Sequence, residues 1–141
     1  MKLRPYQIRA TDGVFESWKT NPSVLVSMAT GLGKTFLSGC IAQVVSAKGY
    51  SVVYETAQAA FGAFEEQKFS RDAETYAAAS EKVKRILNCD LLILDDLGTE
   101  MATPMALSAL YMLINTRLVN GKRMIVSTNL RDEDIKKHYT S

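Results

Sequence analysis

The sequence predicts an α/β fold, a three-layer sandwich in which one parallel sheet is covered by helices on both faces. Two observations predict it. Four short runs are apolar along their whole length, as in strands buried on both faces, and they alternate with longer segments whose apolar residues recur at helical spacing. Such sheets are doubly wound through right-handed crossovers. The 141 residues fit one domain, 1–141, that can bury a substantial core.

Each element is expected from a local signal. Runs rich in Val, Ile and Leu predict strands, apolar residues three or four positions apart predict helices, and Pro or Gly marks helix starts and stops. In chain order we expect a helix at 5–18, a strand at 24–28, a helix at 34–48, a strand at 51–54, helices at 57–69 and 71–87, a strand at 91–94, a helix from 104 to 118, a strand at 124–127 and a short helix near 132.

Composition excludes some classes of protein. The formal net charge of +2 excludes a polybasic nucleic-acid arm, although not a local basic patch. No secretory signal and no apolar run of about 20 residues is seen, so we expect a cytoplasmic protein with no membrane partner. Cys40 and Cys89 stand far apart, which favours two buried small hydrophobes over a disulfide or a metal site.

A glycine loop between the first strand and the next helix is the strongest chemical signal. Residues 29–35 read Ala-Thr-Gly-Leu-Gly-Lys-Thr. Glycines let backbone N–H groups approach a triphosphate, and the following helix adds partial positive charge. Lys34 would reach the β and γ phosphates, and the Thr35 hydroxyl would bind Mg²⁺. The general pattern has Gly where Met28 stands, and the alternative is a plain Gly-rich turn. The expected nucleotide-binding residues here are Thr30, Gly31, Leu32, Gly33, Lys34, Thr35 and Phe36.

Polar residues follow two later strands. Asp95 would hold the metal through water, and Asp96 would polarise the attacking water. Asn129, after the fourth strand, would contact the γ-phosphate or that water. Because ligands bind beyond the carboxyl ends of parallel strands, these groups and the glycine loop should meet at one edge. The alternatives are a solvated strand end for the acids and a turn-forming Asn.

The amino-terminal segment 3–7 reads Leu-Arg-Pro-Tyr-Gln. The Gln7 amide has a donor and an acceptor that match the N6 and N7 edge of adenine. Arg4 or Tyr6 would lie against the base. A solvated helix start is the alternative interpretation.

Two family resemblances follow from these motifs. Residues 1–47, with the segment 3–7 and the glycine loop, resemble the start of superfamily-2 helicases. Residues 48–141 resemble the AAA+ helicase loaders and transposition helpers of the DnaC/IstB type, in the segments 91–100, 110–117 and 127–130. We therefore hypothesise a recombined or engineered chimera with its junction near 47–50. One natural family aligning continuously across residues 40–60 would contradict it.

The resemblances imply a P-loop NTPase that binds ATP or ADP with Mg²⁺. The loader family implies single-stranded DNA and a replicative helicase or transposase as partners. In that family a fifth strand, an arginine finger and a helical lid follow the strand that corresponds to the fourth strand here. The sequence ends about a dozen residues after Asn129, so we expect truncation, weak or no ATP hydrolysis, and self-association through an open sheet edge.

Three functions stay open at this point. They are a loader-like ATP-binding core, a truncated superfamily-2 motor lobe and an engineered nucleotide-binding scaffold without a biological partner. The helicase-type Asp-Glu-x-His/Asp is absent, since Asp95-Asp96-Leu97-Gly98 stands there, and this favours the loader-like core. Asp-Asp where many such ATPases have Asp-Glu also shortens the reach of the base.

Overall fold

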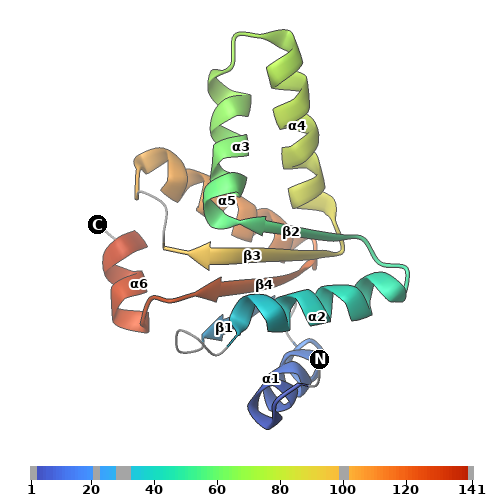
Figure 1. Ribbon diagram of the computed structural model, residues 1–141. Helices are drawn as coiled ribbons and strands as arrows, with labels where there is room; N and C mark the ends of the chain where they lie inside the picture. Colours follow the sequence, from blue (N-terminus) through green and yellow to red (C-terminus); the bar gives the residue numbers. More distant parts are fainter. Residues whose placement is uncertain (1–2, 21–22, 28–32, 99–101, 140–141) are drawn as a thin grey trace.

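The computed structural model describes residues 3–20, 23–27, 33–98 and 102–139, and within these ranges the side chains of residues 23–27 and 34 are not described. It forms a parallel four-stranded sheet with helices on both faces, which confirms the predicted α/β class (Figure 1). The elements are α1 (Pro5–Ser17), β1 (Ser23–Ser27), α2 (Lys34–Ala47), β2 (Val52–Thr56), α3 (Ala57–Phe69), α4 (Ala73–Asn88), β3 (Leu91–Leu97), α5 (Pro104–Val119), β4 (Arg123–Thr128) and α6 (Asp132–Tyr139).

The strand order is β1-β4-β3-β2, so the first strand lies beside the fourth. The strands start nearly level, because Leu91 pairs with both Val52 and Arg123 and Ser23 pairs with Met124. All four carboxyl ends therefore meet at one edge of the sheet, on the left in Figure 1.

Two apolar cores separate the three layers. Alternate residues of the central strands face opposite ways. Leu92 and Leu94 of β3 pack with α3, α4 and α5, whereas Leu91 and Ile93 pack with α1 and α2. These β3 residues are at most 1% exposed. At roughly 25 cal/mol per Å² of apolar area, burial on both faces is a main source of the sheet's stability.

Helices α3 and α4 form an antiparallel hairpin that rises from the sheet (Figure 1). Side chains cap both helices: Thr56 Oγ1 accepts from Ala59 N at 3.1 Å, and Asp72 Oδ2 accepts from Thr75 N at 2.9 Å. These bonds satisfy N–H groups that lack partners inside a helix. Helix α4 begins after the Asp72 cap, two residues later than the approximate start at residue 71 expected from the sequence.

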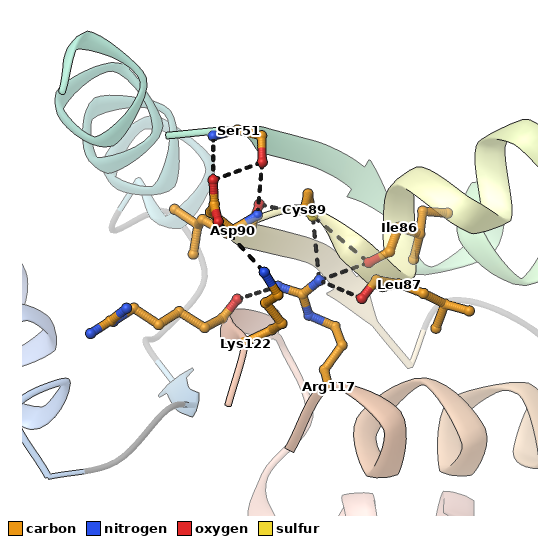
Figure 2. Close-up of polar contacts among 9 residues, drawn as sticks. Ser51, Ile86, Leu87, Cys89, Asp90, Arg117 and Lys122 are labelled. Atoms are coloured by element: carbon orange, nitrogen blue, oxygen red, sulfur yellow. Dashed lines mark hydrogen bonds and ion pairs between the residues drawn. The ribbon is translucent and has the colours of Figure 1, made fainter. Parts of the chain in front are cut away.

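A fully buried arginine joins the end of α4 to the start of β4 (Figure 2). Arg117 Nη1 donates to the carbonyls of Ile86 at 2.9 Å and Leu87 at 3.3 Å, and Nη2 donates to the Arg123 carbonyl at 2.6 Å. Nη1 also lies 3.4 Å from Cys89 Sγ. Burial lowers the pKa of Arg117. The guanidinium satisfies carbonyls that the helix end leaves unpaired.

Close to this arginine, the turn before β3 is hydrogen-bonded to Ser51, the residue that precedes β2 (Figure 2). Asp90 Oδ2 accepts from the backbone N and the hydroxyl of Ser51, each at 2.9 Å, and Asp90 lies 3.7 Å from Lys122 Nζ. The two cysteines are free thiols, Cys89 buried and Cys40 only partly buried. No described helix is long and apolar enough to cross a membrane.

Strand β3 is longer than expected. The apolar run predicts a strand at 91–94 with both acids beyond it, but β3 continues to Leu97. Asp95 pairs with Thr56 of β2, and Leu97 pairs with Thr128 of β4. Backbone pairing on both sides holds polar residues in a strand that their own propensity does not favour.

Candidate functional site

Of the predicted site residues, the structure brings together Thr35 at the start of α2 and Asp95 of β3, which are hydrogen-bonded. Gly33 is the residue before α2 and has a φ of 78°, a left-handed conformation that suits glycine. The unpaired N–H groups of the first turn of α2 therefore follow directly on the glycine loop, which is the arrangement that binds phosphate. Thr30, Gly31, Leu32 and the Lys34 side chain lie outside the described parts of the chain.

Asp95 is the centre of the described site and is 5% exposed. Its Oδ2 accepts from Thr35 Oγ1 at 3.1 Å and from Tyr54 Oη at 2.8 Å, and its Oδ1 accepts from Ser127 Oγ. Burial by itself would raise the pKa of Asp95, but the three hydroxyl donors outweigh it and lower the pKa. The carboxylate is therefore held ionised between α2, β2 and β4.

The donor set suits a hard divalent cation. Mg²⁺ prefers oxygen ligands, often one or two carboxylates completed by water and phosphate. Thr35 brings a hydroxyl from α2 and Asp95 a carboxylate from β3, and their hydrogen bond places the two oxygens 3.1 Å apart. The residues present therefore fit Mg²⁺ bound together with a nucleotide.

Asp96 sits in an irregularity of β3. The pairing register with β4 shifts between Leu94 and Leu97, and Asp96 has a φ of 55°, a left-handed conformation in a residue other than glycine. Its backbone N donates to Ser127 Oγ at 3.4 Å. A bulge of this kind turns consecutive side chains out of strict alternation. It separates the surroundings of Asp96, which is half-buried, from those of buried Asp95.

The bend after β4 is anchored to β3. Thr128 Oγ1 donates to the Leu97 carbonyl at 2.6 Å and accepts from Leu130 N at 3.1 Å. Asn129 lies between these contacts and is exposed. The bend therefore holds Asn129 at the same edge as Asp95.

In the amino-terminal segment, Gln7 lies beside Gly33 at the end of the glycine loop. Gln7 is 6% exposed, and its Oε1 accepts from Arg4 N at 2.9 Å. Its Nε2 lies so close to Gly33 that a Cβ added there would come within 2.9 Å. Arg4 is exposed and Tyr6 is half-buried. Phe36 is 37% exposed. The structure thus brings Gln7 to the loop and leaves Arg4 in solvent.

Tyr54 and Ser127 belong to the site, although their motifs do not identify them. Tyr54 pairs with Ile93, which places it on the same face of the sheet as Asp95, two residues further along β3. Burial raises the pKa of Tyr54, and its hydrogen bond to Asp95 raises it further, so the hydroxyl stays protonated and acts as a donor. The sequence did not identify Tyr54, because the register that places it there is a property of the packed sheet.

Comparisons with known proteins identify a family and structures with a similar fold. A family model described as IstB-like ATP binding protein matches residues 14–139. The structure of the DnaC helicase loader is similar with a TM-score of 0.73 and 20% identity over 99% of this chain and 83% of that one. The structure of DnaI has a TM-score of 0.71 and 21% identity over 99% and 75%. A search of the curated proteins finds no significant match.

Replication initiators have the same fold. A DnaA bound to AMPPCP and single-stranded DNA has a TM-score of 0.72 and 18% identity over 100% of this chain. This chain spans 46% of that DnaA, less than half of its length. At these identities the likeness shows the fold alone.

The chimera hypothesis is not supported. One family model runs across residues 14–139 and so through the hypothesised junction at 47–50. A single family that aligns continuously across residues 40–60 contradicts a two-part origin. The superfamily-2 resemblance of the first segment has no support from the comparisons.

The family assignment rests on the share of the chain that is matched. The model covers the helix α1 from Val14 onward, the α2 region, both acids of β3 and Asn129. The structural neighbours share the parallel sheet and its flanking helices. The chain therefore belongs to the family of IstB-like ATP-binding proteins and has the AAA+ P-loop fold.

Proposed function

We propose that this chain binds ATP or ADP together with Mg²⁺ at the carboxyl edge of its sheet and hydrolyses ATP slowly. The observation that carries the proposal is the hydrogen bond from Thr35 Oγ1 to Asp95 Oδ2, 3.1 Å long. It joins the start of the phosphate-binding helix to the buried carboxylate, as a shared metal ion requires.

Each residue has a distinct role in this proposal. The backbone of the loop 30–36 and Lys34 hold the phosphates. Thr35 and Asp95 hold Mg²⁺, which stabilises the charge on the β and γ phosphates when bound. Asp96 orients the attacking water, and Asn129 contacts the γ-phosphate or that water.

Slow turnover follows from the short base. Asp96 is one methylene shorter than the Glu common at this position, and it sits in a bulge that fixes its backbone. In phosphoryl transfer, positioning and charge stabilisation supply most of the rate. We infer that an arginine from a partner would be needed for fast hydrolysis, since such fingers give about 10³-fold or more.

Calorimetry with Mg²⁺ tests the nucleotide site. We expect ATP binding by the wild type and its loss in Lys34→Ala. Lys48→Ala is the matched control, because Lys48 is exposed at the other end of α2 and should leave the affinity unchanged. Phosphate release then separates an enzyme from a binding module. No binding by the wild type would overturn the proposal.

Gln7 provides a test of base recognition. Its amide is buried beside Gly33, close to where the loop begins the helix. We propose that Gln7, with Tyr6 or Arg4 against the ring, contacts adenine. Gln7→Ala should weaken ATP more than GTP, and equal weakening would assign Gln7 a role in holding the loop instead.

A second proposal concerns single-stranded DNA. The tip of the α3–α4 hairpin exposes Phe69 (61%) and Tyr76 (50%), and Lys68 Nζ lies 5.6 Å from the Phe69 ring centroid. Exposed aromatics beside cations stack on bases. In fluorescence anisotropy with labelled oligo-dT, Phe69→Ser should bind more weakly than the wild type, and the control Tyr111→Ser on α5 should not.

The relation to the helicase loader extends this second proposal. We infer that a replicative helicase is a partner of this chain, since the structurally similar DnaC is named a helicase loader. Size-exclusion chromatography of this chain with a purified replicative helicase, with and without ATP, tests it. Separate elution in both conditions would exclude a stable complex.

A further inference from the structure

Asp95 Oδ2 accepts hydrogen bonds from two hydroxyl groups, which belong to two different elements of the fold. Thr35 at the start of α2 donates over 3.1 Å, and Tyr54 of β2 donates over 2.8 Å. The carboxylate is 5% exposed, so water cannot readily replace a missing donor. Thr35 and Tyr54 are therefore the two donors that hold Oδ2, while Ser127 holds Oδ1 of the same carboxylate.

The position of Tyr54 in the sheet explains why it reaches this oxygen. Tyr54 pairs with Ile93, and Thr56 pairs with Asp95, so Tyr54 lies one alternation before Asp95 on the same face. A side chain at residue 54 must extend along the strand to contact residue 95. Tyrosine has a long, rigid side chain that ends in a donor, and residue 54 is 36% exposed.

We propose that Tyr54 is a positioning residue of the metal–nucleotide site, acting through Asp95. Its hydroxyl holds Asp95 Oδ2 in the position where this oxygen accepts the hydrogen bond from Thr35 Oγ1. A hydroxyl that donates its one proton to Asp95 keeps its oxygen lone pairs for the metal. Tyr54 thereby orients the Thr35 hydroxyl so that its oxygen lone pairs are available to Mg²⁺, and Tyr54 itself contacts neither metal nor nucleotide. This inference rests on the proposed function.

In this role Tyr54 affects the binding of Mg²⁺ and leaves nucleotide binding without metal unchanged. Groups that orient metal ligands typically change metal affinity by about 10- to 100-fold when removed. A purely structural tyrosine would change folding or all nucleotide binding alike. The readout is thus the Mg²⁺-dependent gain in ATP affinity, measured by calorimetry as the ratio of the dissociation constants in EDTA and in Mg²⁺.

The test variant is Tyr54→Phe, which keeps the ring and removes only the hydroxyl. We expect its Mg²⁺-dependent gain to fall about 10-fold, with the affinity in EDTA unchanged. Tyr111→Phe is the control, because Tyr111 is 75% exposed on α5 and should match the wild type. If Tyr54→Phe does not fold, Tyr54→Met lacks the hydroxyl and fills the space flexibly.

A double-mutant cycle tests whether Tyr54 acts through Asp95. In an Asp95→Asn background, Tyr54→Phe should have no further effect on the Mg²⁺-dependent gain. An unchanged gain in Tyr54→Phe, an equal loss with and without Mg²⁺, or an additive loss in the cycle would each overturn the inference while ATP binding stands. A wild type that binds no ATP would overturn the proposed function instead, and the inference with it.

Discussion

A buried carboxylate costs free energy unless hydrogen bonds satisfy it, and Asp95 has three hydroxyl donors. Two of them, Tyr54 and Ser127, come from the strands on either side of β3. The residue is therefore stable as an anion. A metal that arrives with the nucleotide meets a carboxylate whose orientation is already set.

Glycine 98 is a residue whose identity the fold requires. It has a φ of 103°, and an added Cβ would lie 2.3 Å from Leu130 Cδ1. Gly98→Ala should lower the free energy of unfolding by more than about 2 kcal/mol, because the strained backbone adds to a clash with the bend that carries Asn129. Urea denaturation measures it.

Gly49→Ala is the control for Gly98→Ala. Gly49 has a φ of 88°, but an added Cβ meets nothing within 4 Å. It should show the backbone cost alone, about 1–2 kcal/mol. Equal losses in the two variants would show that Leu130 moves aside without cost.

At the scale of elements, the caps of α3, α4 and α5 are side chains of the residues just before them. Thr56, Asp72 and Thr103 each accept a backbone N–H of the first turn. Local chemistry thus sets where these helices start. Their ends depend on distant groups, as the contact of Arg117 with α4 shows.

The Asp72 cap makes the stability of α4 depend on pH. The backbone N–H and the hydroxyl of Thr75 lower the pKa of Asp72 below its ordinary value. A lowered folded-state pKa stabilises the protein above the unfolded pKa of about 4, and this contribution is lost as pH falls further. The urea midpoint of Asp72→Ala should therefore lie below that of the wild type at pH 7 and approach it at pH 3.

Asp72→Asn separates charge from capping. Asn caps helices about as well as Asp but does not titrate. The difference between Asp72→Asn and Asp72→Ala should then be the same at pH 7 and pH 3. A difference that vanishes at pH 3 would show that pH acts on α4 through another group.

Arg117 hydrogen-bonds to both α4 and β4, and we expect this link to make a large contribution to the free energy of unfolding. Arg117→Leu introduces a smaller, apolar side chain and leaves the buried carbonyl of Ile86 and the partly buried carbonyl of Arg123 without this donor. We expect the free energy of unfolding to fall by about 3 kcal/mol or more. Leu118→Ala, at an adjacent residue that is 45% exposed, should cost much less. Comparable losses would contradict the proposed linking role.

At the scale of the whole molecule, the edges of the sheet are the feature that remains open. Among the described residues, β1 pairs only with β4, and β2 pairs only with β3. An edge strand offers unpaired N–H and C=O groups to another chain. The β1 edge lies beside the strand that carries Ser127, so pairing there would bring a second copy near the nucleotide site.

We expect self-association through β1. Sedimentation velocity should show dimers or larger species as the protein concentration rises. Successive residues of a strand direct their N–H groups to opposite neighbours, so one of Val24→Pro and Leu25→Pro removes a group facing β4 and the other a group facing outward. One variant should lose association while keeping the wild-type melting temperature. Monomers alone at the highest concentration would contradict this expectation.

Much of the fold was predictable because its signals are local. Apolar runs and helical periodicity give the type and order of every element, and turn residues give most boundaries within a few positions. Where the boundaries differ, as at β3, pairing with neighbouring strands extends the element.

The sequence by itself determined the fold class and named Thr35 and Asp95, because a phosphate loop and a strand ending in acids are contiguous patterns. Only the tertiary structure decided that Tyr54 and Ser127 complete the surroundings of Asp95 and that Arg117 closes α4. These contacts join residues 31 to 41 positions apart in the chain. They depend on strand register and burial, which are properties of the packed molecule and leave no periodic trace in any one segment.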